Sequence, residues 1–140
     1  MPKAENIHII GSLGLLIVAH NSLLNMQSVS NVIIELKNNP FFQEEYSVLI
    51  DIRNADTNLT IEEIEDLSSF VYENLNGIEV KKFAIIATES QTNKTVHFVR
   101  NYKHSSKYQV FSTLEAALFW LKVPQDRKSQ IEIKLNYLHK

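Results

Sequence analysis

One apolar run constrains the fold more than any other feature of this sequence. It spans residues 46–53 (YSVLIDIR) and ends on a carboxylate and a guanidinium, Asp51 and Arg53. Continuous β-branched and aliphatic residues over a short run are typical of a strand covered on both faces. We therefore expect a buried central strand whose polar end lies at the edge where α/β sheets usually bind ligands.

Other strand and helix patterns alternate along the chain around this run. Further strands are predicted at residues 6–10, 15–20, 83–88 and 108–111. The first two are joined by Gly11-Ser12-Leu13-Gly14, where glycine permits the positive φ of a tight turn, so the chain should begin with a β-hairpin. Residues 9–19 have the length of a signal-peptide apolar region, but the two glycines and the flanking Glu5 and His8 favour the hairpin.

Apolar residues at spacings of three and four predict the first two helices. The first should begin after Ser22 or Asn25 and stop before Pro40. Its predicted inner face is Met26, Val29, Val32, Ile33 and Leu36. The second should begin at a capping box formed by Thr60 and Glu63 and stop at Asn76-Gly77. Its predicted inner face is Ile61, Ile64, Leu67, Val71 and Leu75, with Phe70 beside it. Phe41 and Phe42, between the first helix and the central strand, are predicted core anchors.

Three more helices are predicted in the second half of the chain. Ser90 or Thr92 should cap the third, with its inner face at Thr95, Val96, Val99 and Tyr102. Ser112 and Glu115 have the spacing of a capping box for the fourth, which should end near Val123-Pro124. Residues 125–140 fit a strand or a helix by periodicity, and their composition favours a helix.

Together these patterns predict one α/β domain with a mixed, mostly parallel sheet of about five strands. An N-terminal β-hairpin and four to five helices complete it, because alternating strands and helices form parallel sheets with right-handed crossovers. Residues 1–123 should form the domain, and residues 124–140 a C-terminal helical extension of it.

Composition narrows the function classes. Lysine and arginine number 14 against 16 acidic residues, a balance that argues against nucleic-acid binding. The chain has no cysteine, which excludes disulfides, thiolate zinc sites and cysteine nucleophiles and fits a cytoplasmic protein. No apolar run is long enough to span a bilayer, so we expect no membrane partner.

Three segments resemble the SpoIIAA-like (STAS-like) family of small bacterial proteins. They are NPFF followed by YSVLIDIRNAD within residues 39–56, KKFAIIATES at 81–90 and QVFSTLEAALFWL at 109–121. The resemblance implies the fold described above and a non-enzymatic regulatory or protein-interaction module. In the anti-sigma-factor antagonists of this group, an Asp-Ser-Ser-Gly motif carries a phosphorylatable serine after the central strand. Here that motif is absent, and the equivalent stretch is residues 56–60 (DTNLT). Thr57 and Thr60 are candidate phosphoacceptors, although Thr60 also suits a plain N-cap.

Polar residues at the ends of two predicted neighbouring strands form the main candidate binding site. They are Asp51, Arg53, Asn54, Thr60, Thr88 and Ser90. Parallel strands would gather them at one sheet edge beside two helix N-termini, an arrangement that suits an anion or a small polar ligand. The alternative is structural: Asp51 and Arg53 pair with each other and Asn54 makes an Asx-turn.

Catalytic and metal constellations are weak in this sequence. His97 and His104 are seven residues apart, but His8, His20 and His139, the remaining histidines, belong to distant elements, so no metal is predicted. No G-x-S-x-G elbow or phosphate-binding glycine loop occurs among only three glycines. We therefore predict no enzyme, no catalytic residue and no cofactor.

With no catalytic or metal-binding constellation predicted, two binding functions fit the sequence. The first is docking of a protein partner on the helix after the central strand, with Ile61 and Asp66 as contact candidates. The alternative is a carrier of a small apolar ligand or an anion, in an interior that phenylalanines would line or simply fill. Those phenylalanines are Phe41, Phe42, Phe70, Phe83 and Phe98. Self-association as a homodimer through the hairpin edge or the tail helix is a further expectation.

Overall fold

The computed structural model describes residues 5–42, 45–75, 80–101 and 105–138. One mixed sheet contains five strands in the spatial order β1-β2-β3-β4-β5. Their bounds are β1 Glu5–Ile10, β2 Leu15–His20, β3 Ser47–Asp51, β4 Phe83–Ile86 and β5 Tyr108–Phe111. β1 is antiparallel to β2, and every other neighbouring pair is parallel. The predicted α/β class, with the apolar run of residues 46–53 in the central strand, is confirmed.

A tight turn joins β1 to β2, as the glycine pattern predicted. Residues Gly11–Leu13 form one turn of 3-10 helix, and Gly14 follows in the left-handed region with φ 58°. The phenol ring of Tyr46 lies 3.7 Å from the position of a side-chain carbon at Gly14, so this turn is closed by the residue that precedes β3. The hairpin places β1 at one edge of the sheet.

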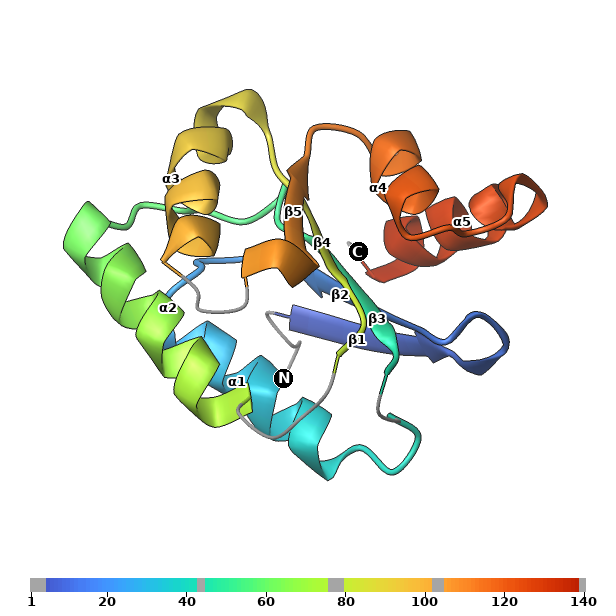
Figure 1. The fold of residues 1–140 in the computed structure, drawn as a ribbon, viewed down its shortest axis with the longest axis horizontal. Helices are drawn as coiled ribbons and strands as arrows, with labels where there is room; N and C mark the ends of the chain where they lie inside the picture. The colour runs from blue at the N-terminus through green and yellow to red at the C-terminus, as the bar shows by residue number, and fades with distance from the viewer. Residues whose placement is uncertain (1–4, 43–44, 76–79, 102–104, 139–140) are drawn as a thin grey trace.

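Helices cover both faces of the sheet (Figure 1). On one side lie α1 (Met26–Asn38), α2 (Ile61–Leu75) and α3 (Glu89–Arg100), and on the other side lie α4 (Leu114–Trp120) and α5 (Lys128–Leu138). A 3-10 turn, Gln125–Arg127, precedes α5. The helical interpretation of the tail is therefore confirmed, and Ile131, Leu135 and Leu138 of α5 pack in the same core as Leu49 of β3.

The two layers divide the core because side chains alternate along each strand. Val48 of β3 packs with the side chains of α1, α2 and α3, whereas its neighbour Leu49 packs with those of α4 and α5. Both are buried, as are all six residues of β2. This double coverage explains why the strands are continuously apolar.

The N-terminal caps of α1 and α2 are those predicted from the sequence, whereas the caps of α3 and α4 differ from the prediction. Asn25 caps α1, and Thr60 and Glu63 form the predicted box before α2. The predicted caps Ser90 and Thr92 are wrong, because the N-cap of α3 is Thr88, which forms a box with Gln91. The predicted box at Ser112 is also wrong, because the Thr113 hydroxyl accepts from the Ala116 amide.

Three apolar side chains that were predicted to be buried are exposed in the structure. Phe41 is 72% exposed and is not a core anchor, whereas Phe42 packs against the core. Met26 and Ile61, assigned to inner helix faces, are the first residues of α1 and α2 and are largely exposed. The predicted stop at residues 76–77, and Tyr102 and His104, lie outside the described residues.

Candidate functional site

Asp51 and Arg53, at the end of β3, bind each other. The Arg53 guanidinium donates from Nε to Oδ1 of Asp51 at 3.0 Å and from Nη2 to Oδ2 at 2.8 Å. The Arg53 main-chain amide donates to the same Oδ1 at 3.1 Å, so Asp51 makes the Asx-turn that was expected of Asn54. Hydrogen bonding to this carboxylate raises the pKa of Arg53. The predicted pairing of Asp51 with Arg53 is therefore confirmed. The Asx-turn predicted at Asn54 is wrong, because the turn is made by Asp51.

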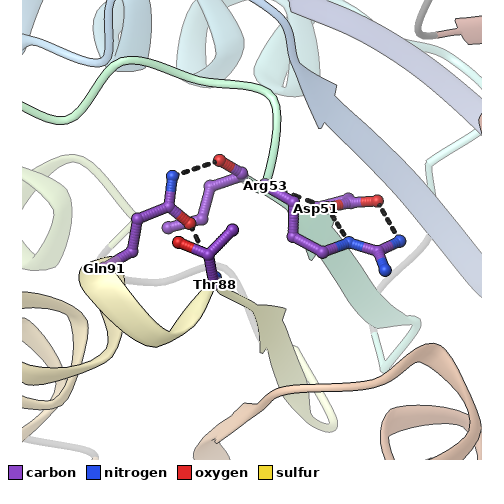
Figure 2. A network of polar contacts seen from close by, with 5 residues as sticks. Asp51, Arg53, Thr88 and Gln91 are labelled. Atoms are coloured by element: carbon purple, nitrogen blue, oxygen red, sulfur yellow. Dashed lines mark hydrogen bonds and ion pairs between the residues drawn. The ribbon is translucent and has the colours of Figure 1, made fainter.

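Gln91 connects the segment after β3 to the start of α3 (Figure 2). Its buried side-chain amide donates to the carbonyl oxygens of Ile52 at 2.8 Å and Ala55 at 3.1 Å. Its Oε1 accepts from the Thr88 main-chain amide at 2.9 Å. The sequence prediction missed Gln91, although its position three residues after Thr88 is the signal of a capping box.

The other residues of the predicted strand-end site are Asn54, Thr60, Thr88 and Ser90. Two of them lie at the start of α3 and two lie elsewhere. The hydroxyls of Thr88 and Ser90 lie 3.1 Å apart at the start of α3, and Thr88 lies near the Asp51–Arg53 pair (Figure 2). Asn54 is exposed, and Thr60 belongs to the start of α2. The structure therefore brings Asp51, Arg53 and Thr88 together at the carboxyl edge, where their polar atoms serve internal contacts.

Thr60 is the N-cap of α2. Its hydroxyl accepts from the Glu63 amide at 3.1 Å, and Glu63 Oε1 accepts from the Thr60 amide at 3.0 Å. These hydrogen bonds lower the pKa of the Glu63 carboxyl. Phosphorylation at Thr60, or at the half-buried Thr57, stays a prediction.

An apolar cavity of about 140 Å³ lies between the sheet and the layer of α1, α2 and α3. The strands contribute alternate residues, which share one face of the sheet: Leu16, Val18, Val48, Ile50, Phe83 and Ile85. Val29 and Val32 of α1, Leu67 and Val71 of α2 and Phe98 of α3 contribute from the helices. Of the phenylalanines predicted to line an interior space, only Phe83 and Phe98 do so among the described residues.

His20 is one of the polar side chains that line this cavity. It is the last residue of β2, is 6% exposed and lines the cavity two residues after Val18. Burial lowers the pKa of His20 to about 4, so the imidazole is neutral at pH 7. Within the described part of the chain, no hydrogen bond joins this imidazole to another residue. A histidine that closes an apolar strand was the available sequence signal.

Three further polar residues of the cavity wall, Gln91, Lys94 and Thr95, have hydrogen-bond partners in the protein. The Thr95 hydroxyl donates to the carbonyl of Gln91 at 2.8 Å, and the Lys94 ammonium donates to the carbonyl of Leu59. Gln91 makes the contacts described above. These bonds fix the carboxyl end of the cavity, where the loop before α2 meets α3.

Metal ligands do not gather in the residues that the structure describes: no group of three histidine, aspartate or glutamate side chains there has suitable geometry. His97 Nε2 lies 3.3 Å from Glu65 Oε1 of α2, and His104 and His139 lie outside the described ranges. Among the described helices, none has both the length and the apolarity needed to cross a membrane.

Comparison with known proteins returned no matching family model and no matching curated protein. The resemblance to the SpoIIAA-like family therefore stays a prediction. Fold and geometry define the class as a small α/β domain with a five-stranded mixed sheet and an apolar cavity under three of its helices.

Proposed function

We propose that this protein is a non-enzymatic binding module that holds a small apolar ligand in the cavity under α1, α2 and α3. The observation that carries the proposal is the volume of about 140 Å³ lined mainly by aliphatic and aromatic side chains. Protein interiors are normally packed with few voids larger than a water molecule. An engineered apolar cavity of about 150 Å³ in another protein binds benzene, so a ligand of that size fits.

Binding rather than catalysis is favoured by how the nearby polar groups are used. Asp51 and Arg53 hold each other, and the Lys94 ammonium is directed to the Leu59 carbonyl. A general acid or base must reach the reacting group of a substrate. The same contacts argue against an anion site at the strand ends, because the Arg53 charge is compensated by Asp51.

A pair of substitutions on α1 tests the proposal. Val29 lines the cavity and Ile34 is exposed on the same helix, so Val29→Phe should fill the space and Ile34→Phe should leave it open. Toluene would be titrated into each protein while methyl resonances of the cavity residues are followed by NMR. We expect saturable shifts in the wild type and in Ile34→Phe, and their loss in Val29→Phe.

Native mass spectrometry of gently purified protein complements the titration. A mass increase removed by Val29→Phe would identify a resident ligand. Circular dichroism controls for folding, because overpacking a core costs about 1–3 kcal/mol. Absence of saturable toluene shifts in the folded wild type would overturn the proposed function.

A second candidate, regulatory docking of a protein partner on α2, has its own support. The outer face of α2 is acidic and solvent-exposed, and Ile61 is exposed at its start beside Glu62, Glu65 and Asp66. An apolar residue framed by carboxylates suits a partner with a basic rim. Affinity capture with wild type, Ile61→Asp and Asp66→Lys tests it, with Ser69→Ala on the same exposed face as the control. Loss of the same partner from both charge variants, but not from the control, is expected.

A further inference from the structure

His20 places a polar imidazole in a cavity wall that is mainly apolar. The cavity wall is aliphatic and aromatic, yet this imidazole, 6% exposed, forms part of it at the end of β2. A neutral imidazole carries one hydrogen-bond donor and one acceptor. None of the described residues hydrogen-bonds to this imidazole, and its ring nitrogens are not among the fully buried polar atoms that lack a partner. His20 therefore keeps a donor and an acceptor available to a ligand in the cavity.

We infer that the ligand combines an apolar body with one uncharged hydroxyl or similar group that hydrogen-bonds to His20. This inference rests on the proposed function and names the chemical class that the cavity would take. A hydroxyl matches an imidazole because it can both donate and accept. The apolar body would lie along Val18, Val48 and Ile50, which extend from the His20 end of the same sheet face.

The charges around the cavity favour an uncharged ligand. Burial keeps His20 in its neutral form at pH 7, because the lowered pKa lies well below that pH. Lys94, the other basic side chain in the wall, donates to the carbonyl of Leu59 at the rim. A carboxylate ligand would thus be desolvated against aliphatic side chains with no cation positioned to compensate it.

Toluene and phenol are a matched pair of probes for this inference. They have the same shape and number of non-hydrogen atoms, and each is close to the size of benzene, which fits a cavity of this volume. They differ only in a methyl or hydroxyl group. The ratio of their dissociation constants therefore measures what the protein offers to a hydroxyl, while toluene alone measures the cavity.

Four proteins should be compared by NMR titration with both probes at pH 7: wild type, His20→Leu, His20→Gln and His8→Leu. His8 lies on β1 and does not line this cavity, so His8→Leu is the same substitution outside the site. We expect His20→Leu to weaken phenol about tenfold relative to toluene, the size of one lost hydrogen bond to a buried group. His20→Gln should restore part of the preference, and His8→Leu should leave it unchanged.

The outcomes separate the inference from the function on which it rests. If toluene and phenol bind the wild type and His20→Leu with the same ratio, the inference is overturned while the apolar binding function stands. If neither probe binds the folded wild type, both are overturned. A selective loss of phenol in His20→Leu, with toluene binding and the folded spectrum retained, supports the hydroxyl-bearing ligand.

Discussion

Gln91 at the start of α3 donates its side-chain amide to the main-chain carbonyl of Ile52 just beyond β3, at 2.8 Å. The same amide nitrogen reaches the carbonyl of Ala55, and the amide oxygen caps the α3 N-terminus through Thr88. One buried side chain therefore joins the exit of the central strand to the helix that forms one side of the cavity.

Replacing Gln91 by methionine should destabilise the protein by about 2 kcal/mol. Methionine keeps the shape of the side chain but leaves two buried carbonyls and the Thr88 amide without their glutamine partner. Urea unfolding followed by circular dichroism measures the effect. Gln27→Met is the matched control, because Gln27 is an exposed glutamine on α1 whose amide contacts only Asn31 among the described residues. Equal midpoints for the two variants would contradict this role for Gln91.

Arg53→Met should cost about 2 kcal/mol of folding free energy at pH 7. The Asp51 carboxylate is 0% exposed, and removing its bidentate partner leaves a buried negative charge poorly compensated. The estimate is below that for a fully buried pair because the Arg53 side chain is 37% exposed. Lys128→Met, which breaks the exposed pair with Glu115, provides the comparison and should change stability far less than Arg53→Met. A similar small effect at Arg53 would refute the argument.

Most of the fold follows from periodicity and composition. The apolar runs at residues 46–53 and 83–88 predicted strands buried on both faces, and β3 and β4 lie at those positions with helices on each side. The capping pattern of Thr60 and Glu63 located the start of α2 to the residue. Such signals are local, so they survive in any tertiary context.

The wrong sequence predictions share one physical cause. Each concerns a feature that depends on tertiary contacts, which the local sequence does not determine. Thr88, Ser90 and Thr92 are all competent N-caps, and Thr88 is used because Gln91 then reaches the Ile52 carbonyl. Phe41 follows Pro40 in a surface loop, and nothing in the sequence distinguishes it from the half-buried Phe42. The cavity could not be predicted, because alternating apolar residues look the same around a filled interior and a hollow one.

The N-cap of α4 is Thr113 and not the adjacent Ser112, and substitutions at the two residues test this difference. Thr113→Ala should destabilise the protein by about 1 kcal/mol, because the Thr113 hydroxyl accepts from the Ala116 amide at the helix start. Ser112→Ala should have an effect near zero, although the sequence pattern of Ser112 and Glu115 resembles a capping box. Thermal unfolding of the two variants decides between the positions. A larger loss at Ser112 would restore the original assignment of the cap.

His20 should make stability depend on pH in the acidic range. Its pKa falls from 6.5 to about 4 on folding because the imidazole is buried, so the unfolded chain binds the proton more tightly. Stability therefore rises with pH between about 4 and 6.5, and acidification from pH 7 to pH 5 should remove about 2 kcal/mol through this residue. His20→Leu eliminates the titrating group, and its urea midpoint should fall less over the same interval. The pKa of His8 is also lowered, by burial and by Lys134, so His8→Leu measures the contribution of a less buried histidine. If His20→Leu lost stability as steeply as the wild type on acidification, the neutral, buried state of His20 would be disproved.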